Sequence, residues 1–235
     1  MPTSLTMRTL IYVPIIHSVA DMGSMGNELK RKSVSGLGEN IWQKHTDTVD
    51  GYWAAIQSYF KNIDLYVLGI KIYQDGMFVD GEMALKLIKD GVKSGSKNSE
   101  IVSNLITRGA ILVKTEDFKM VKDEYDGLQL IIKSNSNIQK LIQLLRYKIV
   151  KPLLLRRRDR FIAATIDETL GPNETGILFI GAYHNVMKRL PKNISVIELK
   201  KVAEIRKYQK TIQSRSKIKR RQLERLSQYM VKKMT

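Results

Sequence analysis

The stretch ILFIGAYHNV, residues 177–186, joins a strongly apolar run to a glycine and to one of the three histidines of this 235-residue chain. A short apolar run that follows a Gly-Pro-Asn turn (171–173) is typical of a strand buried on both faces of a sheet. Gly181 would let the backbone approach another group closely, and His184 lies just beyond the predicted strand. The stretch therefore predicts a buried strand with a candidate functional histidine at its carboxyl end.

Strands and helices are predicted to alternate along the rest of the chain. Apolar, β-branched runs predict further strands at 8–17, 65–76, 110–117 and 193–199. Helical periodicity predicts helices at 41–63, 81–92, 98–108, 117–148 and 156–170, with 134–137 as a candidate break, and the Gly- and Ser-rich segment 18–40 is expected to be a long loop. This alternation predicts an α/β fold with a mainly parallel sheet of about five strands flanked by helices.

Positive charge is concentrated at the carboxyl end of the chain. Residues 200–235 contain 13 Lys and Arg against two acids, a net charge of +11, whereas the whole chain carries +17. We therefore expect an α/β domain at 1–199 and a basic helical extension at 200–235. The apolar residues of 214–235 are irregularly spaced, so this part is expected to be mobile without a partner, and its deletion is expected to leave the core folded.

The composition restricts the class of protein. The chain has no cysteine, which rules out disulfides and cysteine–zinc sites. No apolar run approaches the roughly 20 residues that span a bilayer. The segment LIYVPII (10–16) is followed by polar residues and is read as a strand rather than a signal sequence, so a cytoplasmic location is expected.

Polar side chains follow four of the predicted strands. His17, Asp75, Glu116 and His184 stand at the carboxyl ends of these strands, where ligands bind in parallel α/β sheets. Two imidazoles and two carboxylates at one edge could bind a divalent metal ion or share acid–base work. Polar residues are also expected wherever a strand leaves the core, so a purely structural role for each remains open. The sequence contains no HExxH, P-loop or GxSxG motif.

One part of the chain resembles a known family. The span RDRFIAATIDETL…GILFIGAYHNV…LP, residues 158–191, resembles the end of the TraB/PrgY–TIKI superfamily, which is related to the erythromycin-esterase and ChaN-like proteins. That family has an Arg-Asn-x-x-Met-Ala helix followed by an apolar strand that ends in Gly-x-x-His. Arg158 and Asp159 fall on the first motif, and Gly181 to His184 fall on the second.

The family has an earlier Gly-x-x-His motif, which His17 resembles, although Pro14 stands where glycine is expected. The resemblance implies a metal-dependent, hydrolase-like site. In it, His17 and His184 would bind a divalent metal ion, and Asp75 or Glu116 would complete the metal shell or activate a water molecule. Arg158 would stabilise developing negative charge. A packing role for Arg158, which belongs to the run 156–158, is equally open.

The basic extension allows a second kind of function. Its cations suit the phosphate backbone of a nucleic acid or another polyanion, and an anionic membrane surface or an acidic protein would suit the same charge. The candidate contact residues lie in SRSKIKRR (214–221): Lys217, Lys219, Arg220 and Arg221. Three functions therefore remain: a TraB/TIKI-like hydrolase of unknown substrate, a non-enzymatic regulatory or binding protein that uses the tail, and a metal-dependent nuclease or phosphoesterase.

Overall fold

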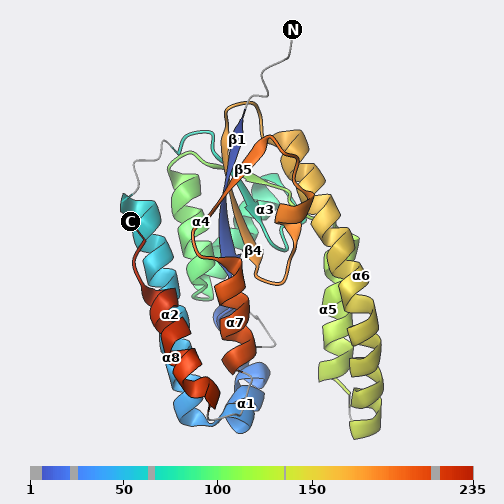
Figure 1. Cartoon of the computed structure of the whole chain (residues 1–235). Coiled ribbons are helices and arrows are strands. Elements are labelled where there is room, and N and C mark those ends of the chain that lie inside the picture. Colours follow the sequence, from blue (N-terminus) through green and yellow to red (C-terminus); the bar gives the residue numbers. More distant parts are fainter. Residues whose placement is uncertain (1–6, 22–25, 63–66, 135, 213–217, 235) are drawn as a thin grey trace.

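A five-stranded parallel sheet forms the centre of the computed structural model, which describes residues 7–21, 26–62, 67–134, 136–212 and 218–234 (Figure 1). The strand order is β3-β2-β4-β1-β5, and every neighbouring pair is parallel. The strands are β1 (Arg8–Ile15), β2 (Lys71–Gln74), β3 (Ile111–Val113), β4 (Thr175–Gly181) and β5 (Ile194–Glu198). The predicted α/β fold is confirmed.

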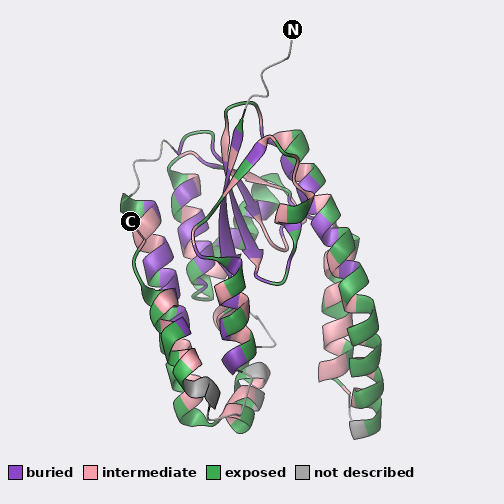
Figure 2. Ribbon diagram, viewed as in Figure 1, coloured by how far each residue is buried: buried purple, intermediate pink, exposed green. Residues whose placement is uncertain are grey.

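Helices cover both faces of this sheet, and the strands are the most deeply buried part of the molecule (Figure 2). On one face Trp53 donates a hydrogen bond to the carbonyl of Ile16. On the other face the hydroxyls of Tyr73 and Thr169 are 2.8 Å apart. The helices are α1 (Gly26–Leu37), α2 (Glu39–Asn62), α3 (Gly81–Lys93), α4 (Lys97–Thr107), α5 (Phe118–Ile132), α6 (Asn137–Thr169), the 3-10 helix η2 (Val186–Arg189), α7 (Val202–Ile212) and α8 (Ile218–Val231).

Two local predictions were wrong. The segment expected to be a loop over 18–40 contains helix α1, and α2 begins immediately after it; residues 22–25 lie outside the described part. The separate helices expected at 117–148 and 156–170 are instead α5 and one long helix α6, which continues through Pro152. The break does occur at 134–137, where the Ser136 side chain accepts a hydrogen bond from the Gln139 amide and caps α6.

The expectation of a mobile tail over 214–235 was also wrong for helix α8, whereas residues 214–217 lie outside the described part. Leu226 and Met230 of α8 are fully buried and belong to the same hydrophobic core as the sheet. The ammonium group of Lys200 donates to the carbonyls of Tyr229 and Lys232 at 3.0 and 2.6 Å, which fastens the end of α8. Few apolar residues suffice because α8 packs between α2 and α7 rather than on a broad surface (Figure 1). No helix among the described residues is long and apolar enough to cross a bilayer.

Candidate functional site

The carboxyl edge of the sheet brings the predicted site residues into one region. The connection after β1 crosses toward β2, and the connection after β4 crosses back toward β5, so the strand order reverses between β1 and β4. Ligands of parallel α/β sheets bind at such a switch point. Asp75 follows β2, Glu116 follows β3 and His184 follows β4. Three of the four strand-end residues therefore converge on the same place, together with Arg158 from α6.

Arg158 is the centre of this group. Its Nε lies 2.5 Å from Glu116 Oε2, and one terminal nitrogen lies 2.6 Å from Asp75 Oδ1 and 2.5 Å from Glu116 Oε1. The other terminal nitrogen donates to Glu124 of α5. Arg158 itself is only 5% exposed. A planar guanidinium with donors in a fixed fork suits such multiple carboxylate contacts, so it holds β2, β3, α5 and α6 together.

Backbone amides also bind the carboxylates of Asp75 and Glu116. Gly181 donates to Asp75 Oδ2 at 2.9 Å, and Gly76 donates to Glu116 Oε1 at 2.7 Å. A Cβ atom at residue 181 would come within 3.0 Å of Asp75 Oδ2 and 3.6 Å of a His184 ring carbon. Glycine at position 181 lets the Asp75 carboxylate lie directly against the backbone.

His184 is held by a second carboxylate, Asp159. The Nδ1 atom of His184 lies 2.7 Å from Asp159 Oδ1, and the Asn185 amide donates to Asp159 Oδ2 at 3.1 Å. The other ring nitrogen, Nε2, faces Asp75 Oδ2 at 3.7 Å. With the Asp159 carboxylate as the acceptor, Nδ1 carries the proton of this hydrogen bond, and Nε2 is the nitrogen that can exchange a proton.

Helix α7 fixes the loop that carries His184. Arg206 donates to the carbonyls of Ala182 and His184, the latter at 2.6 Å, and to the Asn185 side chain at 3.0 Å. Carbonyl groups at the end of a strand lack sheet partners, and the guanidinium satisfies them. The basic carboxyl-terminal segment thus contributes to the site through Arg206, a role that its composition did not reveal.

The buried charges shift the pKa of each ionisable group in the cluster. Burial lowers the pKa of His184, but the hydrogen bond that its ring donates to Asp159 and the charge of Asp75 outweigh burial and raise the pKa. Burial opposes ionisation of Asp75, but His184, Arg158 and His17 hold its pKa well below the ordinary value. Burial raises the pKa of Glu116, and the charge of Asp75 acts in the same direction. The result is an ionised Asp75 beside an imidazole that tends to keep its proton.

Three buried polar atoms near this edge lack a hydrogen-bond partner within the described part of the chain. They are the Tyr12 hydroxyl, Gln74 Oε1 and Arg189 Nε. Tyr12 lies on β1 and is fully buried, and the charges of Arg206, Asp159 and Asp75 all act on its hydroxyl. The Tyr12 and Gln74 side chains project from opposite faces of the sheet, because Tyr12 is in register with Leu178 and Gln74 with Phe179. Buried polar groups are normally satisfied, so the Tyr12 hydroxyl, on the side of Asp159, is a group to which a bound molecule could hydrogen-bond.

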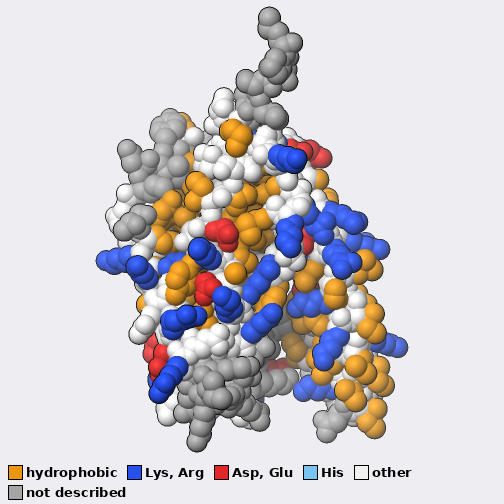
Figure 3. Space-filling model, viewed as in Figure 1, with side chains coloured by type: hydrophobic (Ala, Val, Ile, Leu, Met, Phe, Trp, Pro, Cys, Tyr) orange, Lys and Arg blue, Asp and Glu red, His pale blue; other side chains and the backbone are white. Residues whose placement is uncertain are grey.

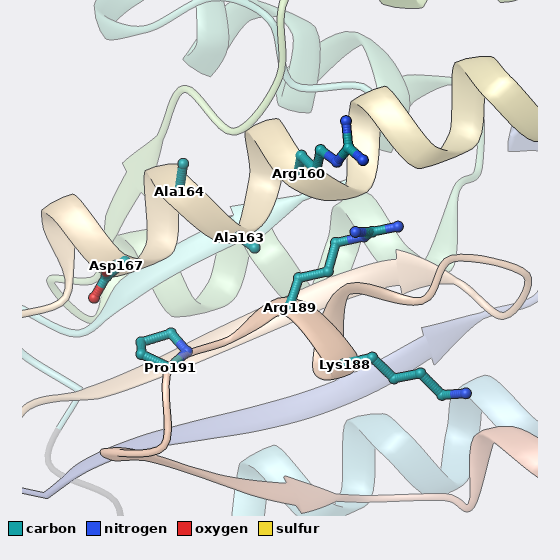
Figure 4. A pocket seen from close by; sticks show the side chains of 7 residues that line it. All are labelled: Arg160, Ala163, Ala164, Asp167, Lys188, Arg189 and Pro191. Atoms are coloured by element: carbon teal, nitrogen blue, oxygen red, sulfur yellow. The ribbon is translucent and has the colours of Figure 1, made fainter.

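A pocket of about 450 Å³ opens beside the same region, between α6 and η2 (Figure 4). Arg160 from α6 and Arg189 from η2 extend in the same direction along it, and Asp167 and Pro191 lie toward its other end (Figure 4). The Nε atom of Arg189 is 4.0 Å from Asp159 Oδ2. The pocket is therefore connected to the His184–Asp159 pair through one side chain.

The arrangement does not fit a divalent metal ion. The carboxylates of Asp75 and Glu116 are occupied by Arg158 and by backbone amides, and Nδ1 of His184 is occupied by Asp159. Within the described residues there is no group of three or more His, Asp or Glu side chains arranged to hold a metal ion. The guanidinium of Arg158 supplies the positive charge between these carboxylates.

The other predicted site residues are placed as follows. His17 is exposed just after β1 and acts on Asp75 through its charge. Arg158 does not reach outward to a substrate, because its terminal nitrogens are bound to carboxylates. Lys217 lies outside the described residues. The backbone of Lys219 and Arg220 belongs to α8, and the side chain of Arg221 on the same helix is exposed.

Sequence reasoning did not identify four contributors to the site. Asp159 entered only through the family resemblance, and Glu124, Tyr12 and Arg206 were not selected at all. Glu124 and Arg206 lie on helices distant in sequence, so no local spacing connects them to the strand ends. In comparisons with known proteins, no family model, curated protein or solved structure matches the chain.

Proposed function

We propose that the chain is a hydrolase of the TraB/TIKI-like type whose proton-transfer group is His184. The observation that supports this proposal is the buried His184–Asp159 pair at the switch point of the sheet, with Nε2 directed to Asp75. In general acid–base catalysis by a histidine, a carboxylate orients the imidazole through one ring nitrogen, so that the other ring nitrogen can exchange a proton.

In this proposal each side chain has a separate task. Asp159 holds the His184 ring and stabilises its protonated form. His184 Nε2 takes a proton from the attacking water and returns a proton to the leaving group. Arg158 keeps the Asp75 carboxylate in place and ionised, as a positioning residue. The unpartnered Tyr12 hydroxyl can donate a hydrogen bond to an oxygen on which charge develops.

The substrate is expected to carry an anionic group. Arg160, Lys188 and Arg189 line the adjacent pocket, against one acid, Asp167, which is paired with Arg8 at 2.6 Å. Carboxylate and phosphate groups are the ligands that arginine side chains bind best. Phosphoesters are therefore the first substrate class to assay, with a neutral carboxylic ester for comparison.

The test is a hydrolysis assay with p-nitrophenyl acetate, p-nitrophenyl phosphate and bis(p-nitrophenyl) phosphate, on the wild type and on His184→Ala and Asp159→Asn. Loss of a general acid–base group typically lowers the rate by about 10²- to 10⁴-fold. His45→Ala is the control, since His45 bonds to Tyr208 away from the site. Equal loss in the His45 and His184 variants, or activity that survives His184→Ala, would show that His184 transfers no proton.

A second candidate function is a non-enzymatic binding protein that holds a polyanion. The supporting observation is that Arg158, Asp75 and Glu116 satisfy one another, as a structural ion-pair cluster would, while Arg221 and Arg225 of α8 are exposed. Binding of heparin or single-stranded RNA by a protein that hydrolyses none of the three substrates would favour this candidate. Metal content of the purified protein separates both candidates from a metal-dependent nuclease.

A further inference from the structure

Helices α5 and α6 form an arm that extends beyond the sheet (Figure 1). The amino-terminal half of α6 packs on α5, and most of its side chains are exposed to solvent (Figure 2). An exposed helix is expected to present polar residues to water and apolar residues to its partner. On α6 large apolar side chains are exposed to water as well.

The exposed face of this half-helix is apolar. Six large aliphatic side chains recur at intervals of one, three or four residues, which places them on one side of the helix. Ile138 and Ile149 are 74% and 78% exposed, and the other four are between 45% and 58% exposed. The apolar stripe consists of Ile138, Leu141, Ile142, Leu145, Ile149 and Leu153.

The face that packs on α5 is identified by different residues. The Tyr147 hydroxyl is 3.4 Å from Glu124 of α5, and the Tyr147 ring lies where a Cβ atom at Gly127 would touch it. Tyr147 stands two residues from both Leu145 and Ile149, so it is about 200° around the helix from them. The stripe therefore points away from α5, and within the described part of the chain nothing covers it.

Positive charge borders the apolar stripe. Residues 137–158 contain no Asp or Glu. Arg146 follows Leu145 and Lys148 precedes Ile149, and one residue corresponds to about 100° around the helix. The two cations therefore lie on opposite sides of the stripe. Cations and apolar side chains lie together along the arm in the space-filling view (Figure 3). Six cations of this segment form no ion pair with any described residue: Lys140, Arg146, Lys148, Lys151, Arg156 and Arg157.

We propose that the apolar stripe of α6 binds the surface of an anionic lipid bilayer. An apolar helix face flanked by Lys and Arg inserts into the headgroup region, where its cations meet acidic lipids. The stripe covers about 22 Å of helix from residue 138 to residue 153, and an arm that projects from the body can lie along a surface. A second copy is a poorer occupant, because pairing two stripes would bring two sets of unpaired cations together without an acid on either face.

The test is flotation of the full-length protein with vesicles of phosphatidylcholine alone or mixed with phosphatidylglycerol, at low and high salt. Wild-type protein should float with the mixed vesicles, and binding should fall as salt increases. Leu145→Glu with Ile149→Glu should weaken binding at least about tenfold, because two aliphatic side chains that would insert into the bilayer are lost. Arg146→Gln with Lys148→Gln should reduce the preference for acidic lipid.

Met83→Glu is the matched control, because Met83 is an exposed apolar residue on α3, outside the arm. Circular dichroism of every variant shows whether the helices are retained. Wild-type protein that floats with neither vesicle, or a Leu145/Ile149 variant that binds as well as Met83→Glu, would overturn the proposal. Analytical ultracentrifugation gives a further contradicting outcome: a wild-type dimer that does not bind vesicles, together with a monomeric Leu145/Ile149 variant. The stripe would then bind a second copy of the chain. None of these outcomes depends on hydrolytic activity.

Discussion

The strand-end site and the α5–α6 arm depart from the usual distribution of residues in opposite directions. At the site, Arg158, Asp159 and Glu116 are charged residues that are almost completely buried. On the arm, Ile138 and Ile149 are large aliphatic residues that are mostly exposed. Buried charge and exposed apolar surface are both informative about function. A buried charge destabilises the fold unless a counter-charge pairs with it, and an exposed apolar surface is unfavourable in water unless a partner covers it.

The compensation differs between the two regions. The buried charges compensate one another inside the chain, through the bonds from Arg158 to three carboxylates. The arm has no such internal compensation, so a partner outside the chain must provide it. Mutations at the site should therefore change stability, and mutations on the arm should mainly change association.

The largest effect on the free energy of unfolding is expected from Arg158→Ala, because Arg158 binds three carboxylates of the site. Removal of the guanidinium leaves Asp75 and Glu116 buried without a counter-charge, and loss of one partner of a buried ion pair typically costs about 3–5 kcal/mol. Urea unfolding monitored by circular dichroism measures the change. Arg157→Ala is the control on the same helix, and its exposed side chain should contribute within about 0.5 kcal/mol. Similar values for the two variants would show that the cluster does not hold the fold.

Gly181→Ala should have the second-largest effect. The new methyl group would lie 3.0 Å from Asp75 Oδ2, so the carboxylate must move away from the Gly181 amide and from Arg158. Overpacking of this kind typically costs about 1–3 kcal/mol. The matched control is Gly36→Ala in helix α1, where a Cβ atom meets nothing within 4 Å and should not destabilise the protein. An unchanged urea midpoint for Gly181→Ala would refute the close-approach explanation.

The sequence was informative where structure follows from local pattern, and much less so where it follows from packing. The apolar run before Gly181 identified β4 correctly, because a strand buried on both faces leaves that pattern. Asp75, Glu116 and His184 were identified because the ends of parallel strands lie at one edge. The roles of Glu124 and Arg206 depend on how α5 and α7 pack, which no spacing records. Helix α1 was missed because glycine and serine suggest a loop.

A smaller effect is expected in the pH dependence of stability. The pKa of His184 is raised from 6.5 in the folded state, so the protonated imidazole stabilises the fold below about pH 6.5. This stabilisation should be lost as the pH rises through the higher folded-state pKa. The pKa of Asp75 is lowered, so its contribution is present above its ordinary value and is lost only in acid.

The free energy of unfolding, measured from about pH 5 to 9, should therefore decline at the alkaline end in the wild type, because the unfolded chain then holds fewer protons than the folded one. His184→Gln should show a flatter profile over this range. His45→Gln is the control, since burial lowers the pKa of His45 and its contribution has the opposite sign. A profile for His184→Gln that declines as steeply as the wild type would assign the decline to another group.

The smallest effect on stability is expected on the outer surface of α8. Deletion of residues 214–235 cannot test polyanion binding alone, because it would remove Leu226 and Met230 from the core and unfold part of the protein. Arg221→Gln with Arg225→Gln tests the charge alone. Both side chains are exposed, so the unfolding midpoint should hardly change. Affinity for heparin should fall, and the slope of log affinity against log salt should become shallower, since fewer counterions are released.

The control is Arg146→Gln with Lys148→Gln on the arm, which removes the same charge elsewhere. If both double variants weaken heparin binding equally, the attraction belongs to the overall charge of +17 rather than to α8. A loss confined to the α8 variant would make that helix a polyanion-binding surface separate from the arm.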